Sequence, residues 1–144
     1  LKEGTELYSV WGSEGLTDVL GCTGQNMGKA HIFMDGQKTF KNAVKRMGSA
    51  AAEVLEQSGY TMDDIDYVVC HQANERIIDA VVKRMDIPEE KVVKVIARYG
   101  NTSAASIPIA LDEMYEQGML EKGNRILLAT FGAGFTWASM IVEI

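Results

Sequence analysis

Helical and extended hydrophobic patterns alternate along the chain. Over residues 40–55 the apolar positions recur every three or four residues, which predicts a helix with one apolar face. The same period returns over residues 77–85 and in a third segment that ends near Gln117. Gly59 follows the first segment, and a glycine at such a position commonly caps a helix. The pattern therefore predicts three main helices.

Short apolar runs lie before, between and after these helices and predict strands. The runs cover residues 5–12, 65–70, 92–97, 125–132 and 136–144. Strands that alternate with helices are typical of an α/β domain, so we expect helices layered on a mixed, mostly parallel five-stranded sheet. The last two strands are joined by a short turn and should pair antiparallel. Residues 12–28, in a region rich in glycine, serine and threonine, predict an irregular segment.

The third helix is apolar nearly all round. Its apolar residues are Ala104, Ala105, Ile107, Ile109, Ala110, Leu111 and Met114. A helix of this kind requires cover on every side, and one sheet covers only one side. The sequence also begins at Leu1 rather than at a methionine. Both observations suggest that the chain is a piece of something longer.

Composition and charge narrow the class of protein. The 144 residues are 47% apolar and 24% charged, which is ordinary for one globular domain. The formal net charge of −6 argues against general nucleic-acid binding. No apolar run is long enough to span a membrane and no signal peptide is evident, so a cytoplasmic location without membrane contact is expected. The two cysteines form no metal-binding motif, and no metal site is predicted.

The candidate chemistry lies where strands end. His71 and Asn101 each follow a predicted strand, and residues 131–135 form a glycine-bearing turn. The carboxyl ends of parallel strands meet at one edge of a sheet, so these three segments should lie together. A neutral histidine and an asparagine amide both donate hydrogen bonds, and aimed at one oxygen they would stabilise an enolate or a tetrahedral oxyanion. No nucleophile is evident, because Cys70 is expected to be a buried apolar residue and Cys22 to be structural or without a role.

Each of these features also has a simpler interpretation. A histidine at the end of a strand is commonly an ordinary hydrogen-bonded residue. Asn101 could be a helix cap, and residues 131–135 could be only a turn. The basic residues Arg76, Lys83 and Arg84 could be no more than the solvated face of a helix.

Three motifs together point to a known family. The motifs are "HQAN" at 71–74, "GNTSAAS" at 100–106 and "FGAGFTW" at 131–137. Their order and spacing resemble β-ketoacyl-acyl carrier protein synthase III, the thiolase-fold enzyme that starts type II fatty acid synthesis in bacteria and plastids. The resemblance covers nearly the whole chain. It implies that residues 1–144 are a single C-terminal thiolase-like domain, and that the N-terminal half, which carries the nucleophilic cysteine, is absent from this chain.

The resemblance implies an activity for two residues. His71 and Asn101 match the histidine and asparagine of the family's Cys-His-Asn triad. In the family these two residues hold the thioester carbonyl of malonyl-acyl carrier protein while carbon dioxide leaves. The resulting enolate attacks an acyl group that the cysteine took from acyl-CoA. The resemblance further implies that no cofactor is needed and that the full enzyme is a homodimer.

It also implies binding residues. The residues that match the carrier-protein site, or extend it as a basic patch, are Lys41, Gln72, Ala73, Asn74, Glu75, Arg76, Lys83 and Arg84. The substrate tunnel would be lined by Phe40, Ala73, Asn74 and Phe131. The backbone N–H of Ala133, where relatives often carry glycine, would complete an oxyanion hole.

Two alternatives stay open. Another condensing enzyme of the thiolase superfamily, making a polyketide or a quinolone, would share the same histidine and asparagine. The chain could also be a non-catalytic folded half that acts as a binding or assembly partner. Because no residue matches the nucleophile, we expect the chain alone not to catalyse condensation. The acyl-chain preference does not follow from these motifs.

Overall fold

The computed structural model describes residues 7–16, 18–23 and 31–144. The helices are α1 (Gly36–Ser58), α2 (Glu75–Met85), α3 (Ile96–Tyr99) and α4 (Ser106–Glu116). The strands are β1 (Tyr8–Ser13), β2 (Leu20–Thr23), β3 (His31–Met34), β4 (Tyr67–Cys70), β5 (Arg125–Gly132) and β6 (Thr136–Glu143). Short 3₁₀ turns cover Met62–Asp64, Glu89–Lys91 and Ser103–Ala105.

The main sheet has four strands in the order β1-β6-β5-β4. Only β4 and β5 pair in parallel, whereas β5–β6 and β1–β6 are antiparallel. The α/β class and the antiparallel pairing of the last two strands are confirmed, but the prediction of a mostly parallel five-stranded sheet is wrong. The tight β5–β6 turn reverses the chain and so requires these two strands to be antiparallel, whereas β1 pairs with the free edge of β6 from the other end of the chain.

The predicted strand over residues 92–97 is reduced to a single bridge. Val92 pairs in parallel with Val68 of β4, and the N–H of Val93 donates to the carbonyl of Val68 at 3.0 Å. The chain then leaves the sheet, and α3 begins at Ile96. A short apolar run fits a buried strand and a buried helical turn equally well, so its hydrophobic pattern could not separate the two.

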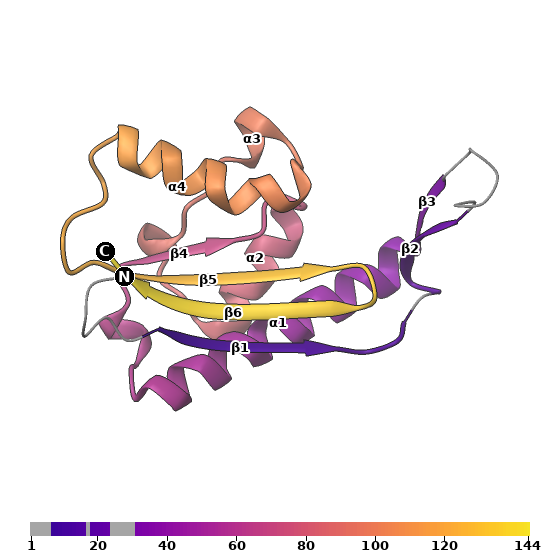
Figure 1. The fold of residues 1–144 in the computed structure, drawn as a ribbon, viewed down its shortest axis with the longest axis horizontal. Coiled ribbons are helices and arrows are strands. Elements are labelled where there is room, and N and C mark those ends of the chain that lie inside the picture. Colours follow the sequence, from indigo (N-terminus) through magenta and orange to yellow (C-terminus); the bar gives the residue numbers. More distant parts are fainter. Residues whose placement is uncertain (1–6, 17, 24–30) are drawn as a thin grey trace.

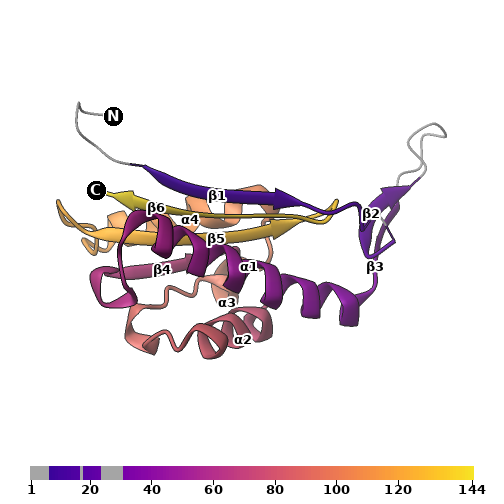
Figure 2. The same ribbon diagram turned by 90° about the horizontal axis from the view of Figure 1, so that it is seen from below.

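Helices cover the two faces of the main sheet unequally (Figures 1 and 2). The helices α1 and α2 lie side by side on one face, and α4 lies on the other face towards β4. Between the sheet and the α1–α2 layer is a core of fully buried side chains, among them Met47, Val54, Ile78 and Leu127. The strands β2 and β3 form a separate antiparallel hairpin beyond one end of the sheet. Part of the segment predicted to be irregular is therefore extended, and residues 17 and 24–28 of it lie outside the described residues.

The structure confirms the long helix predicted over residues 40–55, which already begins at Gly36. The side chain of Asp35 accepts a hydrogen bond from the N–H of Lys38 at 3.0 Å and caps the first turn. Gly59 ends the helix in the left-handed conformation, with φ of 74°. Local capping signals thus agree with the apolar period that buries one face of α1.

Among the described residues, α4 packs against the sheet through one face. Ala110 and Met114 are buried against Val69 and Ile126 of the sheet. On the same helix Tyr115 is 70% exposed. None of the helices within the described residues is long and apolar enough to cross a membrane.

Candidate active site

A cavity of about 1700 Å³ lies at the carboxyl ends of the parallel strands β4 and β5. The predicted site residues in its lining come from the start of α1, the β4–α2 loop, the loop before α4, and the β5–β6 turn, and β1 and the β2–β3 hairpin line it as well. The predicted site residues that line it are Phe40, Lys41, His71, Ala73, Asn74, Arg76, Asn101, Phe131 and Ala133. The fold therefore brings together predicted site residues that lie up to 93 residues apart in the sequence, from Phe40 to Ala133.

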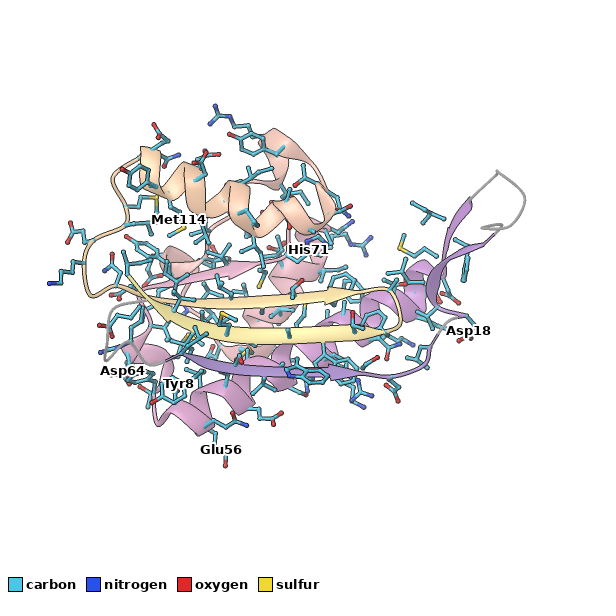
Figure 3. All side chains as sticks on the ribbon, viewed as in Figure 1. Tyr8, Asp18, Glu56, Asp64, His71 and Met114 are labelled. Carbon is cyan, nitrogen blue, oxygen red and sulfur yellow. The ribbon has the colours of Figure 1, made fainter. Side chains whose placement is uncertain are left out.

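His71 is held from two sides at the end of β4, beneath the first turn of α4 (Figure 3). Its Nδ1 lies 2.6 Å from the Oγ of Ser106. The ring of Phe131 meets the imidazole edge-on at 5.5 Å between centroids, and Phe131 in turn stacks on Phe135. Burial lowers the pKa of His71 from its ordinary value of 6.5, because a charged ring is poorly solvated here. The side chain is thus an oriented, neutral imidazole at pH 7.

Asn101 lies on the exposed loop before α4. Its Oδ1 accepts a hydrogen bond from the N–H of Ser103 at 3.0 Å, which forms a side-chain turn at the start of a 3₁₀ segment. Gly100 precedes it with φ of 68° and ψ of −160°, a backbone conformation that is nearly restricted to glycine. Because Oδ1 is used as the acceptor, the amide Nδ2 remains to donate. Asn101 therefore supports the turn and can still present a donor to the cavity.

The β5–β6 turn brings Ala133 to the rim of the cavity. Ala133 is exposed, and its carbonyl accepts a hydrogen bond from the Oγ1 of Thr136 at 3.3 Å. The role of its N–H as an oxyanion donor stays a prediction.

The neighbouring cysteine is unsuited to nucleophilic chemistry. Cys70 is fully buried, and burial raises the pKa of its thiol to about 12. The prediction that Cys70 is a buried apolar residue is confirmed. The side chain of Cys22 lies outside the described part of the chain.

Gln72 differs from the expectation that it contacts a carrier protein. Its side chain is 1% exposed. Its Nε2 donates to the carbonyls of Cys70 and Val93 at 2.8 and 3.3 Å. Its Oε1 accepts from the N–H groups of Val95 and Ile96 at 2.9 and 3.1 Å. A side chain so enclosed is not accessible to a docking protein, and it instead joins the loop after β4 to residues 93–96.

The other predicted docking residues lie at the surface. Lys41, Arg76, Lys83 and Arg84 are exposed, and no ion pair involves them within the described residues. Lys41 and Arg76 line the cavity, whereas Lys83 and Arg84 lie further along α2. The stem of Arg84 passes close to Gly48, where an added Cβ would lie 3.0 Å from it.

Asn74 and Glu75 occupy the first turn of α2. The Oδ1 of Asn74 accepts from the N–H of Arg76 at 2.9 Å and caps the helix. Glu75 is exposed and does not line the cavity. Asn74 therefore has a capping role that its position in the "HQAN" motif did not predict.

The lowered pKa of His71 predicts a pH effect on the folded chain. The unfolded histidine binds protons more tightly than the folded one, so the free energy of unfolding should fall as the pH drops from 6.5 through the lower folded value. We expect the imidazole Cε1–H chemical shift of His71 to titrate with a midpoint below 6.5. His31→Gln, by removing the other histidine signal, assigns the resonance. A midpoint at or above 6.5 would contradict the burial of the ring in the folded chain.

Two of the polar side chains that line this cavity are neutral hydrogen-bond donors, the imidazole of His71 and the carboxamide of Asn101. Among the described residues no three His, Cys, Asp or Glu side chains gather as metal ligands would. Such donors suit an oxygen atom on which negative charge develops.

Comparisons with known proteins agree with this chemistry. Residues 55–144 match the model of the family described as 3-oxoacyl-[acyl-carrier-protein (ACP)] synthase III C terminal. A β-ketoacyl-[acyl-carrier-protein] synthase III of Caldanaerobacter subterraneus is 54% identical over 112 residues, which are 78% of this chain and 34% of the relative. The same enzyme of Xanthomonas axonopodis is 44% identical over 98% of this chain and 43% of the relative. The chain thus spans well under half the length of these relatives.

Solved structures extend the likeness to the fold. The crystal structure of the synthase III of Thermus thermophilus aligns with the whole chain and 48% of that protein, with a TM-score of 0.91 and 38% identity. The OleA protein of Xanthomonas campestris, solved with lauric acid and lauroyl-CoA, aligns with a TM-score of 0.84 and 25% identity, over the whole chain and 42% of that protein. The thiolase-like fold class is therefore shown. Within that class, the family model and the more similar sequences all belong to synthase III. The chain belongs to the 3-oxoacyl-[acyl-carrier-protein] synthase III family, whose C-terminal part it matches.

Proposed function

We propose that this chain supplies the carbonyl-binding half of the active site of a 3-oxoacyl-acyl carrier protein synthase III. The observation that carries the proposal is the shared cavity of His71 and Asn101, two neutral donors at the carboxyl edge of the sheet. The reaction is decarboxylative condensation of malonyl-acyl carrier protein with an acyl group taken from acyl-CoA, the first elongation step of fatty acid synthesis.

The roles of the two residues follow from electron flow. The Nε2–H of His71 and the Nδ2–H of Asn101 donate to the thioester oxygen of the malonyl group. The bond from the malonyl α-carbon to the carboxylate breaks, carbon dioxide leaves, and the electron pair forms an enolate whose charge rests on that oxygen. The enolate carbon attacks the acyl-cysteine carbonyl, and the cysteine thiolate is expelled. These steps need no cofactor.

The nucleophilic cysteine must come from outside the described residues, because Cys70 is buried with a pKa of about 12. The proposed partner is the N-terminal half of the same enzyme. One feature supports it: α4 packs against the sheet through one face, while Tyr115 on the same helix is 70% exposed. We further propose that the complete enzyme is a homodimer of the cytoplasm.

The proposed carrier-protein site is the basic surface formed by Lys41, Arg76, Lys83 and Arg84. Lys41 and Arg76 lie at the cavity itself, so a carrier protein bound there could deliver its thioester inwards. Carrier proteins are acidic, and a local cationic surface on a chain of net charge −6 would orient them. Gln72 is left out of this surface because its side chain is buried.

The test is to assay the chain alone and together with the N-terminal half of a synthase III. Two steps are followed separately: transfer of a labelled acyl group to cysteine, and release of carbon dioxide from malonyl thioester. We expect neither condensation nor acyl transfer by the chain alone, and both half-reactions in the assembled enzyme. Substantial condensation by the chain alone would make one of its own cysteines the nucleophile. Assembly without decarboxylation would favour the non-catalytic alternative.

The same assay tests the carrier-protein partner. Arg76→Glu should weaken the use of malonyl-acyl carrier protein and reduce its salt dependence, while acyl transfer from acyl-CoA changes little. Lys122→Glu, a charge reversal at an exposed residue outside the cavity lining, serves as the matched control. An equal loss of both half-reactions in Arg76→Glu would indicate damage to the fold and remove the docking role.

The alternative of another condensing enzyme of the thiolase superfamily is less favoured, because a solved structure of a different member of that fold is less similar in sequence. The chain is 38% identical to the Thermus thermophilus synthase III and 25% identical to OleA over the same coverage. The synthase III and OleA share one fold, so the proposal that this chain acts in fatty acid synthesis rests on sequence identity and not on the fold.

A further inference from the structure

Ser106 begins α4 and lies against the imidazole of His71. It is 2% exposed. Its Oγ is 2.6 Å from the Nδ1 of His71 and 3.3 Å from the backbone N of Gln72. The contact joins segments that are 35 residues apart in the chain. No role for this serine follows from the motif in which it lies.

The two contacts of the hydroxyl determine the direction of the hydrogen bond. The N–H of Gln72 can only donate, so the serine oxygen accepts from it. The hydroxyl has one hydrogen, and donating it to Nδ1 satisfies all three groups. If Nδ1 donated instead, the buried hydroxyl would need another acceptor, and none contacts it within the described residues. The imidazole nitrogen is therefore the acceptor.

A neutral imidazole that accepts at Nδ1 carries its hydrogen on Nε2. We propose that Ser106 is a positioning residue that holds His71 in the Nε2-protonated tautomer, with that N–H as the donor to the cavity. This inference rests on the proposed function only for the identity of the acceptor, the thioester oxygen. The tautomer itself follows from contacts within the chain.

The neighbouring network keeps this geometry in place. The side chain of Gln72 bonds to the carbonyl of Cys70 and to the N–H of Val95, which anchors the loop on both sides of His71. Its backbone N–H is thereby held towards Ser106. The edge contact with Phe131 limits rotation of the ring. The serine hydroxyl then selects between two tautomers of a ring whose place is already set.

The test is two-dimensional ¹H–¹⁵N NMR of the imidazole at a pH where His71 is neutral, using two-bond couplings that distinguish the tautomers. We expect the chain to show His71 protonated on Nε2, with Nδ1 shifted as a hydrogen-bond acceptor. In Ser106→Ala the two nitrogen resonances should move towards each other, because the second tautomer becomes populated. Ser106→Thr keeps the hydroxyl and should restore the original pattern. Ser139→Ala removes another 2% exposed hydroxyl, which bonds to Leu128, and should leave His71 unchanged.

Two results would overturn the proposal. One is protonation on Nδ1 in the unaltered chain, which is read without any variant and so does not depend on the folding of Ser106→Ala. The other is a Ser106→Ala spectrum identical to that of the unaltered chain. No substrate is present, so the outcome is independent of catalysis. An Nε2-protonated His71 in an assembled enzyme that does not decarboxylate malonyl thioester would instead refute the proposed function alone.

Discussion

Replacing either His71 or Asn101 with alanine is expected to slow decarboxylation of malonyl thioester by about 100- to 1,000-fold in the enzyme assembled with an N-terminal half. Each residue is proposed to donate one hydrogen bond to the oxygen that becomes negative, and that charge is absent from the ground state. The loss should therefore appear in the rate of carbon dioxide release rather than in the binding of the thioester.

Acylation is the internal control for this prediction. Labelled acyl transfer to the cysteine should persist in both variants, because neither donor is proposed to act in that step. The double variant should lose less than the product of the two single losses, since residues that act as one unit are not additive. Asn124→Ala is the matched control for Asn101→Ala: Asn124 also accepts a backbone N–H, that of Glu121, but lies outside the cavity lining. Normal decarboxylation by Asn101→Ala would reduce Asn101 to its turn with Ser103.

The helices were predictable because their signals are local. The apolar period of α1 and α2 and the glycine that ends α1 lie within a few residues of one another. The direction in which two strands pair depends on segments that can lie far apart in the sequence. The close connection between β5 and β6 permits only antiparallel pairing, and that prediction is confirmed. Nothing in the sequence of β1 specifies that it pairs with β6 from the far end of the chain.

The residues of the candidate site likewise fall into those that a local sequence pattern predicts and those that depend on distant contacts. His71 and Asn101 were predictable because both follow apolar runs, and the segment of Phe131 joins them at one cavity. The residues that hold His71 in place were not predictable from the sequence. Ser106 and Gln72 act through contacts across 35 and 23 residues, which require α4 and residues 93–96 to be in place. A buried glutamine beside a surface-loop motif has no sequence signal of its own, since glutamine is mostly exposed.

Replacing Gln72 with leucine is the second change with a large expected effect, on stability. Leucine is of similar size and fills the space, but it cannot bond the two N–H groups of Val95 and Ile96 or the carbonyls of Cys70 and Val93. A buried backbone group left without a partner costs about 1–3 kcal/mol, and the apolar side chain offsets part of this. We expect the free energy of unfolding to fall by about 2–4 kcal/mol.

Urea denaturation of the chain measures this loss, with the slope of the transition compared between variants. Gln57→Leu is the matched control, because Gln57 is exposed and, within the described residues, its side chain bonds only to Glu53 of its own helix, so it should change stability by less than about 0.5 kcal/mol. Amide exchange at Val95 and Ile96 should speed up in Gln72→Leu more than exchange in α1, because the lost bonds are local to residues 93–96. If Gln72→Leu is as stable as the unaltered chain, water or a shifted backbone must satisfy these groups. The loop after β4 would then not depend on Gln72 to hold His71 at the cavity.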